Sequence, residues 1–338
     1  MNKLDTITSK KFVDICDFVF SEVITVKDYS NLSNKKELII FDKNEENVLY
    51  QKNNLNISDN SVIFCTSFMV NDFFSLLKKI KNVKNITLIT HQGDNLIDQN
   101  IYRKRPQSIS RWFSTNVGFV NESLIPIPIG ISNYNMKNLN ELHFQNLKSD
   151  SFFRDKDNFL YINFQKNTNN KEREGIYENF KFEKWAYTEQ PHQTLINYKS
   201  TIQNSSFILS PWGNGIDTHR IWEALYLGSI PITKYHHCLS TLSDLPVLFV
   251  NNYSEISEDL LNEYLIKNIN TKFNFEKLDF SYWKSQILSG KDMLNTKRYY
   301  VANNRSIKPY KFKKFIERYT KIIMFFLKKI KKIVKLPL

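Results

Sequence analysis

The stretch FILSPWGNGIDTHRIWEALYLGSIPIT, residues 207–233, decides the fold of this 338-residue chain. Its first four residues predict a short buried strand, and its last five, SIPIT, predict a second one. Between them, PWGNGI predicts a turn in which glycine permits positive φ and close backbone approach, followed by a helix that Asp217 caps and Gly228 ends. In strand, loop and helix units of this kind, ligands bind beyond the carboxyl ends of the strands, where the loop meets the helix.

The same alternation of strands and helices runs through both halves of the chain. Alternation of this kind is typical of parallel sheets covered by helices. We therefore expect an α/β protein of two Rossmann-like, parallel-sheet domains that face a cleft. Apolar runs predict strands at 37–41, 61–66 and 86–90 with a helix at 71–80, then strands at 159–164 and 246–250 with helices near 171–180 and 192–204. The expected divisions are a first domain at 1–132, a linker at 133–158, a second domain at 159–304 and a tail at 305–338.

The tail holds most of the net charge of +13, because residues 305–338 contain twelve Lys or Arg and a single acid. Its apolar residues recur at helical spacing, with lysines on the opposite side. A basic amphipathic helix of this type lies in the headgroup region of an anionic membrane leaflet, and we expect that role here. The alternative is a helix packed on the protein's own core with its lysines in solvent, although a solvated face normally mixes charges of both signs.

The remaining composition favours a reducing compartment. The three cysteines are sparse and unclustered, so they suggest neither a disulfide framework nor a cysteine zinc site. The first residues lack the apolar core of a secretory signal, and no run approaches the roughly 18 apolar residues that a membrane span needs. We expect a cytoplasmic protein that lies peripherally on the inner face of the membrane.

The turn and helix of the opening stretch predict an anion site. Backbone N–H groups and the positive end of the helix dipole favour phosphate, and Arg220 in the first turn adds a charge-assisted contact. Glu223 lies three residues beyond Arg220 and four beyond His219, so all three share one helix face, where a carboxylate suits the hydroxyls of a ribose. The alternative is structural, with Asp217 only capping and Arg220 paired with Glu223. The spacings of a Walker loop and of GxGxxG are absent.

The segment SPWGNGIDTHRIWEALYLGSIPIT resembles the pattern of exostosin-like glycosyltransferases and related bacterial capsule and lipopolysaccharide enzymes. The resemblance covers residues 159–265, with a weaker match in LITHQGD at 88–94 and within 112–131. It implies a two-domain GT-B fold in which the C-terminal domain holds the nucleotide sugar and the N-terminal domain holds the acceptor. The sequence differs from animal exostosins in showing no amino-terminal membrane anchor, so their acceptor chemistry is not transferred.

The resemblance also implies roles for residues of the motif. By position, Arg220 binds the diphosphate, Glu223 binds ribose, and Gly213 to Gly215 form the phosphate loop, with Arg173 as a second phosphate contact. The full set expected to bind the nucleotide sugar is Arg173, Ser210, Gly213, Asn214, Gly215, Asp217, His219, Arg220 and Glu223.

Glycosyl transfer by direct displacement needs a base for the acceptor hydroxyl and positive groups for the departing diphosphate. The strand at 86–90 runs into His91 and Asp94, which are the two expected bases. No metal is expected. The Asp-x-Asp at 155–157 precedes a strand instead of following one, and the neighbours in HHC at 236–238 cannot all point at one ion without strain.

These observations predict a metal-independent, cofactor-free glycosyltransferase of the hexosyltransferase type. It would move a sugar from a UDP- or GDP-linked donor to a glycan or lipid-linked acceptor in surface polysaccharide synthesis. One alternative is a fucosyltransferase-like enzyme that uses a GDP-sugar. Another is a non-catalytic protein whose basic tail binds nucleic acid or a membrane, although the near-neutral body and the lack of an aromatic and basic groove disfavour nucleic acid.

Overall fold

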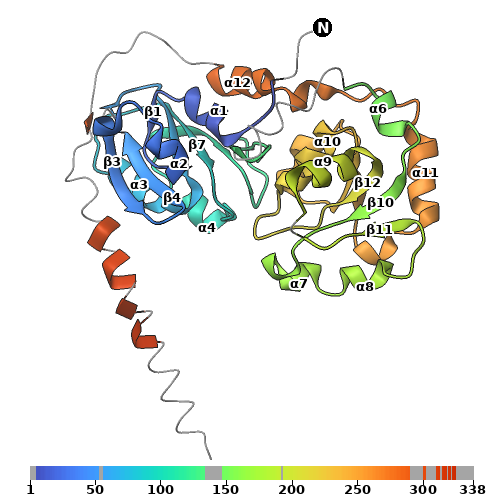
Figure 1. Ribbon diagram of the computed structural model, residues 1–338. Helices are drawn as coiled ribbons and strands as arrows, with labels where there is room; N and C mark the ends of the chain where they lie inside the picture. Colours follow the sequence, from blue (N-terminus) through green and yellow to red (C-terminus); the bar gives the residue numbers. More distant parts are fainter. Residues whose placement is uncertain are drawn as a thin grey trace, which may run out of the picture.

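The computed structural model describes residues 5–52, 56–133, 147–191, 193–289, 300–301, 310–312, 314–317, 319–320 and 322–324. Figure 1 shows two α/β bodies side by side, each built on a five-stranded sheet of its own. Every strand pairing within these two sheets is parallel. The expectation of two parallel-sheet domains is therefore confirmed.

The first sheet has the strand order β1-β6-β7-β8-β9. All residues of β6 and β7 are buried, as is usual for parallel strands that are covered on both faces. The strands expected at 61–66 and 86–90 and the helix expected at 71–80 are confirmed. The strands are β1 (Phe18–Val19), β6 (Val62–Thr66), β7 (Ile86–His91), β8 (Ile109–Ser114) and β9 (Leu124–Pro126), and the helices of this domain are α1 (Ser9–Asp14), α2 (Val26–Ser30), α3 (Val70–Leu77) and α4 (Gln99–Arg103).

A three-stranded antiparallel sheet is inserted between β1 and β6, in the order β2-β4-β3. Its strands are β2 (Glu22–Thr25), β3 (Leu38–Lys43) and β4 (Asn47–Lys52). The strand expected at 37–41 therefore belongs to this small sheet and not to the parallel one. The physical reason is the short turn after β3, where Asn44 Oδ1 accepts the N–H groups of Glu46 and Asn47 and directs the chain straight back.

The second sheet has the order β11-β10-β12-β13-β14. The strands expected at 159–164, 207–210, 229–233 and 246–250 are confirmed within a few residues. The helix expected near 171–180 is two short helices, because Gly175 between them has a left-handed φ of 76°. The strands are β10 (Asn158–Ile162), β11 (Ala186–Thr188), β12 (Ser205–Leu209), β13 (Ile230–Lys234) and β14 (Leu248–Val250), and the helices are α6 (Asp150–Phe153), α7 (Asn170–Arg173), α8 (Ile176–Phe180), α9 (Leu195–Gln203), α10 (His219–Tyr226) and α11 (Glu258–Asn268).

After α11 the chain returns to the first domain. Helix α12 (Phe280–Leu288) packs there, with the Phe280 ring 5.2 Å from Phe12. Strand β15 (Tyr300–Val301) then pairs with β5 (Asn56–Ile57). The expected second domain at 159–304 is thus shorter in the structure, since its last part lies on the first domain. The middle of the expected linker, at 134–146, lies outside the described residues.

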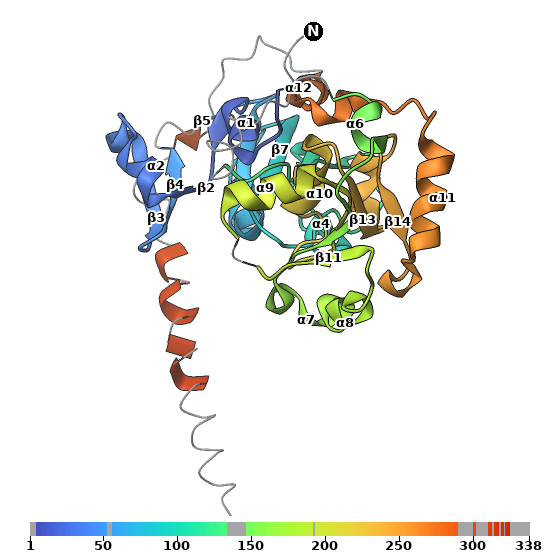
Figure 2. The ribbon, with the colours of Figure 1, turned by 45° about the vertical axis from the view of Figure 1, so that its right-hand side comes forward.

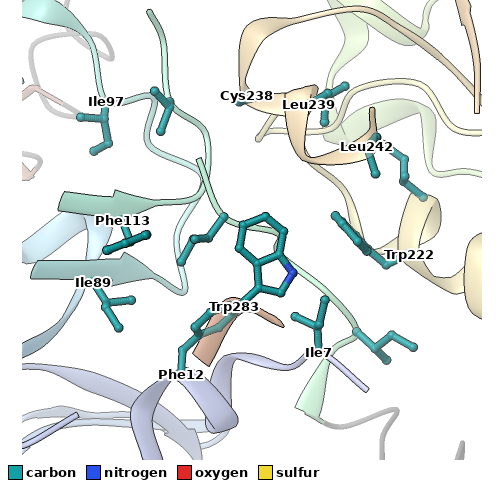
Figure 3. Close-up of a cluster of buried hydrophobic side chains, with 14 of the residues drawn as sticks. Ile7, Phe12, Ile89, Ile97, Phe113, Trp222, Cys238, Leu239, Leu242 and Trp283 are labelled. Atoms are coloured by element: carbon teal, nitrogen blue, oxygen red, sulfur yellow. The ribbon is translucent and has the colours of Figure 1, made fainter. Parts of the chain in front are cut away.

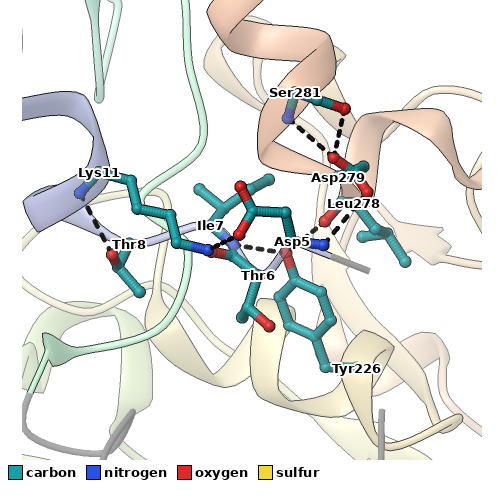
Figure 4. Close-up of polar contacts among 9 residues, drawn as sticks. All are labelled: Asp5, Thr6, Ile7, Thr8, Lys11, Tyr226, Leu278, Asp279 and Ser281. Carbon is teal, nitrogen blue, oxygen red and sulfur yellow. Dashed lines mark hydrogen bonds and ion pairs between the residues drawn. The ribbon is translucent and has the colours of Figure 1, made fainter. Parts of the chain in front are cut away.

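Polar contacts fix the crossing between the domains (Figure 4). The hydroxyl of Tyr226 in α10 accepts the N–H of Ile7 at 2.9 Å and donates to the carbonyl of Leu278 at 2.6 Å. The N–H of Asp5 donates to Asp279 at 3.2 Å, and the N–H of Phe280 donates back to the carbonyl of Asp5. The amino-terminal segment therefore joins the second domain to the returning chain.

An apolar cluster also runs across the domain boundary (Figure 3). Phe113 and Ile89 of the first sheet lie on one side of it, and Trp222 of α10 and Leu242 lie on the other, with Trp283 of α12 between. A shared hydrophobic interface of this kind resists relative domain motion. The positions of the two domains are therefore determined by packing and not by the linker alone.

The described part of the tail is helical and leaves the body beside β3 and β4 (Figure 2). Tyr310 is buried and its ring lies 5.1 Å from that of Phe41 in β3. Beyond this anchor the apolar side chains are exposed, including Phe312 at 66% and Ile323 at 56%. Residues 305–309 and 325–338 of the predicted tail lie outside the described residues. None of the helices that the structure describes has the length and apolarity of a membrane span.

Candidate nucleotide-sugar site

The loop at 210–217 connects β12 to α10, as the sequence predicts, and Arg173 supports it from behind. The Arg173 guanidinium donates to the carbonyls of Trp212 at 2.8 Å, Pro211 at 3.0 Å and Gln165 at 2.8 Å. Burial, and then the charge of Arg220, lowers the pKa of Arg173 to about 10, so it stays cationic at neutral pH. The residue expected to contact phosphate therefore holds backbone carbonyls of the loop.

The loop glycines allow other side chains to approach the backbone closely, and they do not have unusual dihedral angles. A Cβ at position 213 would lie 3.2 Å from Arg173 Nη2, and one at position 215 would lie 2.8 Å from the Asn116 side chain. Positive φ among the described glycines occurs at Gly130, Gly175 and Gly228, outside this loop. Asn214, between the two loop glycines, is exposed.

Asn116, at the carboxyl end of β8, joins this loop to the first domain. Its Oδ1 accepts the N–H of Ile216 at 2.8 Å and that of Asp217 at 3.0 Å. Asp217 in turn accepts the N–H of Ile129 at 2.7 Å and the Trp222 indole N–H at 2.8 Å. Both domains therefore share one hydrogen-bonded unit at the start of α10.

Asp217 was expected to cap the helix, but the capping position is Thr218. Asp217 is 2% exposed, and burial raises its pKa to about 7. His219 Nδ1 lies 2.7 Å from the carbonyl of Gly130, which requires the proton on that nitrogen. Ser210 is fully buried and donates to the carbonyl of Ile208. The described bonds of Asp217 and His219 thus join the two domains, and that of Ser210 stays within the end of its own strand.

Arg220 differs from its neighbours because part of its guanidinium is unpaired. Its Nη1 is buried without a hydrogen-bond partner among the described residues, and so is the Oγ1 of Thr218 at the start of α10. The guanidinium lies 5.4 Å from the centre of the Tyr198 ring, and the Tyr198 hydroxyl donates to Glu223 at 2.8 Å. Glu223 itself is 8% exposed. The structure thus brings Arg220, Tyr198 and Glu223 together.

A cavity of about 390 Å³ opens beside Arg220, which we call the Arg220 cavity. It lies at the carboxyl end of β10 and at the starts of α9 and α10, where ligands of parallel α/β sheets bind. A second cavity of about 410 Å³ shares Gln165 and Pro191 with it and so extends the same hollow. The lining of the Arg220 cavity consists of Asn163, Gln165, Pro191, Gln193, Leu195, Tyr198 and Arg220.

Most of that lining was missed from the sequence. Gln165 directly follows the strand predicted at 159–164 and Asn163 lies at its carboxyl end, and that position is a signal that would have found them. Gln193 and Tyr198 carry no such signal, since they come from the loop before α9 and from α9 itself. The cavity can hold an anion through Arg220 and the helix start, and a polar ring through the amide side chains.

The two expected bases differ in accessibility. His91 is 1% exposed, and its Nδ1 accepts the N–H of Gln92 at 2.7 Å. Burial, and then the proximity of His219, lowers the pKa of His91 to about 3, so it is neutral at physiological pH. Asp94 is exposed in the loop after β7. Only Asp94 of this pair offers surface to an acceptor hydroxyl in the described conformation.

Side chains with metal-binding chemistry are scattered. In the part of the chain that the structure describes, no group of three or more His, Cys, Asp or Glu could hold an ion. Within the segment 236–238, His236 Nδ1 instead lies 3.3 Å from Cys238 Sγ and accepts the N–H of Cys238 at 3.2 Å. These contacts start a short 3-10 helix at His237–Leu242.

Comparison with known proteins matches residues 162–278 to the family described as RXYLT1 C-terminal domain. That segment contains Arg173, the whole loop and α10. This part of the second domain is therefore similar to a family of exostosin-like glycosyltransferases. The resemblance seen in the sequence is confirmed for these residues, and the expected α/β architecture of two parallel-sheet domains agrees with the strand pairings.

A solved structure that matches part of the chain is the crystal structure of AviGT4, a glycosyltransferase involved in avilamycin A biosynthesis. It has 9% sequence identity and a TM-score of 0.31, and the match covers 72% of this chain and 75% of that chain. Comparison with curated protein sequences finds no match.

Proposed function

We propose that this protein is a glycosyltransferase that takes a sugar from a UDP- or GDP-linked donor held in the Arg220 cavity. One observation supports this proposal above the others. Arg220 Nη1 and Thr218 Oγ1 are both buried without partners among the described residues at the start of α10, and Arg220 also lines a polar cavity. Buried polar atoms are costly to leave unpaired, and a diphosphate supplies the acceptors that both atoms need.

In the proposed reaction, the acceptor hydroxyl gives its proton to a base while its oxygen bonds to the anomeric carbon of the donor sugar. The bond from that carbon to the diphosphate oxygen breaks, and its electron pair leaves with the diphosphate. Arg220 and the N–H groups at the start of α10 stabilise this developing charge. We assign the base to Asp94, because His91 is buried. Asp94→Asn should lower kcat and leave the affinity for nucleotide unchanged; an unchanged kcat would exclude this assignment.

In the same proposal Glu223 binds the ribose hydroxyls. The contact of Glu223 with Tyr198 supports the assignment. Tyr198 lines the Arg220 cavity and its hydroxyl donates to Glu223, so the carboxylate lies next to a residue of the cavity wall. Transfer is proposed to proceed without a metal ion, with Arg220 supplying the positive charge. Activity that survives chelation by EDTA would agree with this assignment, and activity restored only by a divalent cation would oppose it.

Calorimetry with UDP, GDP and CMP tests the donor class. A nucleoside diphosphate should bind and CMP should not, because Arg220 and the helix start suit two linked phosphates. A preference for GDP would favour the fucosyltransferase-like alternative. Absence of binding by all three, together with salt-dependent DNA binding through the tail, would favour the non-catalytic alternative.

The tail is proposed to hold the enzyme on the inner face of a membrane, where it builds a surface polysaccharide or lipid-linked glycan. Exposed apolar side chains from Phe312 to Ile323, beside basic residues, support this role. Deletion of residues 311–338 should abolish cosedimentation with vesicles of phosphatidylglycerol. Binding to neutral vesicles should be weak for both the full-length and the truncated protein. Unchanged cosedimentation would refute the membrane role.

A further inference from the structure

Asn116 lies just beyond the carboxyl end of β8, and the first domain fixes its backbone. Its carbonyl accepts the N–H of Ile97 at 2.9 Å, and its φ of 52° lies in the left-handed region. Asparagine tolerates this region better than most residues that carry a side chain. Asn116 is 1% exposed. The first domain therefore holds this side chain in one place, against the loop of the second domain.

The two ends of the Asn116 amide differ in their partners. Its Oδ1 accepts the N–H groups of Ile216 and Asp217, and this double contact determines which end is the oxygen. Its Nδ2 is buried and has no hydrogen-bond partner among the described residues. A Cβ at Gly215 would lie 2.8 Å from this nitrogen, so the NH2 group lies against the loop glycine. The NH2 group is thus a buried, unpaired donor beside the predicted phosphate loop.

A purely structural role would not require this NH2 group. A carboxylate accepts two N–H groups at the start of a helix at least as well as an amide, and the helix dipole favours it. Aspartate at position 116 would therefore satisfy Ile216 and Asp217 and leave no unpaired donor. A buried donor without an acceptor is destabilising. The amide therefore suits a ligand that accepts from it.

Two buried polar atoms of the second domain also lack partners among the described residues. They are Thr218 Oγ1 and Arg220 Nη1, at the start of α10, where Asn116 bonds. The NH2 group and the guanidinium can only donate, and the hydroxyl can donate as well as accept. A ligand rich in acceptor oxygens satisfies all of these groups, and a diphosphate is such a ligand.

The position of Asn116 favours the phosphate that is linked to the sugar. In the proposed function the nucleotide lies in the Arg220 cavity of the second domain, and the base Asp94 comes from the first domain. The reacting end of the donor must therefore face the first domain. The sugar-linked phosphate is next to that end, and so is a first-domain side chain that bonds to the start of α10.

We propose that Asn116 is a donor-binding residue whose NH2 group donates to the sugar-linked phosphate, so that both domains complete the donor site. This inference rests on the proposed glycosyl transfer. A phosphate oxygen reaches the NH2 group after a small shift of the loop at Gly215, and the hydrogen bond strengthens as the diphosphate departs with its charge. The resemblance implies that the C-terminal domain holds the nucleotide sugar, and Asn116 adds a contact from the other domain.

Calorimetry with paired nucleotides tests this proposal on the full-length protein. UDP carries the second phosphate and UMP lacks it, so the ratio of their affinities reports contacts to that phosphate; GDP and GMP replace them if the site prefers guanine. Asn116→Asp keeps both bonds to the loop and replaces the NH2 group with an oxygen that repels phosphate. The preference of this variant for UDP over UMP should fall by at least about tenfold. Its UMP affinity and thermal midpoint should stay close to those of the wild type.

Asn116→Gly removes the NH2 group without adding charge, and glycine adopts a left-handed φ freely. Its preference for UDP over UMP should fall about tenfold. Its UMP affinity shows whether the loop is still in place. Asn121→Asp is the matched charge control, because it adds the same charge at a half-buried position of the same domain, where Oδ1 also accepts a backbone N–H. This control should keep the preference of the wild type.

A preference for UDP that persists in both Asn116 variants would overturn the proposal. If Asn116→Asp lowers the thermal midpoint, a preference that persists in Asn116→Gly is enough to overturn it. Wild-type binding by Asn116→Asp, with equal loss of UDP and UMP affinity in Asn116→Gly, would also overturn it, because Asn116 would then only hold the loop. A wild-type protein that binds neither UDP nor GDP would refute the proposed function and this inference with it, so the two failures are distinguishable.

Discussion

The loop at 210–217 and the residues beside the Arg220 cavity are neighbours in the chain, but their polar groups differ in hydrogen bonding. Those of the loop are paired, whereas some of those beside the cavity are not. In the loop, Arg173 donates to three carbonyls, and Asp217 and Asn116 bond across the domain boundary. At the start of α10, Arg220 Nη1 beside the cavity and Thr218 Oγ1 near it in the chain are buried and unpaired among the described residues. An unpaired buried polar group costs about 1 to 3 kcal/mol. One half of the motif thus builds the domain interface, and the other half has the unpaired groups to which we assign ligand binding.

Arg220→Ala is the strongest way to break this comparison. It removes a donor aimed at the departing diphosphate, so donor hydrolysis or transfer should fall about 100- to 1000-fold. Because the Nη1 of Arg220 has no partner to lose among the described residues, the thermal midpoint should stay close to that of the wild type. The measurement is the rate with the donor selected by calorimetry, together with thermal unfolding.

Arg220→Lys sharpens the result, since lysine keeps the charge and loses the forked geometry of the guanidinium. The rate of this variant should lie between those of the wild type and Arg220→Ala. Arg154→Ala removes an exposed arginine of the same domain and is the matched control. Full activity of Arg220→Ala would mean that the cavity does not bind the reacting diphosphate.

Arg173→Met tests the other side of the comparison. The carbonyls of buried Pro211, half-buried Trp212 and exposed Gln165 lose their donor, so the free energy of unfolding should fall by about 2 kcal/mol. Nucleotide affinity of the folded fraction should remain near that of the wild type, because the guanidinium faces the loop. Urea unfolding and calorimetry measure the two quantities. Normal stability with lost nucleotide binding would instead assign Arg173 to the phosphate, as the resemblance implied.

The fold was largely predictable because its strands are continuous apolar runs. SVIFCT and ITLIT bury every residue from Val62 to Thr66 and from Ile86 to Thr90, and such runs are recognisable without knowing their partners. The strand at 37–41 was placed in the wrong sheet because pairing depends on the hairpin turn at Asn44 and not on the run itself. The return of α12 to the first domain depends on contacts far apart in the chain, such as Phe12 with Phe280.

The candidate site was predictable in place but not in detail. The strand, loop and helix pattern located the start of α10 correctly, and Arg220 lies there beside a cavity. The sequence could not show that Asp217 and His219 bond to Ile129 and Gly130, because those partners lie in another domain. Tyr198 was missed for a different reason, because it contacts Glu223 and Arg220 of its own domain only after α9 packs against α10.

The pH dependence of stability is the smallest of the expected effects. It tests Asp217 at the domain interface without involving the Arg220 cavity. Burial raises the pKa of Asp217 to about 7 in the folded protein, above its ordinary value of 3.8. The folded state therefore binds the proton more tightly than the unfolded state, and stability should fall as pH rises from 3.8 to about 7 and then level off. Between about pH 6 and pH 8 the expected loss is on the order of 1 to 2 kcal/mol.

Urea unfolding of the wild type and of Asp217→Asn at both pH values measures this contribution. The variant cannot titrate, so its pH dependence should be flatter by that amount. It is less stable overall, because Ile129 and Trp222 donate to different oxygens of Asp217 and asparagine replaces one of these oxygens with an NH2 group. Equal slopes for the two proteins would mean that Asp217 stays ionised. The domain contact would then depend on a buried carboxylate stabilised by its hydrogen-bond donors, and acid would weaken it.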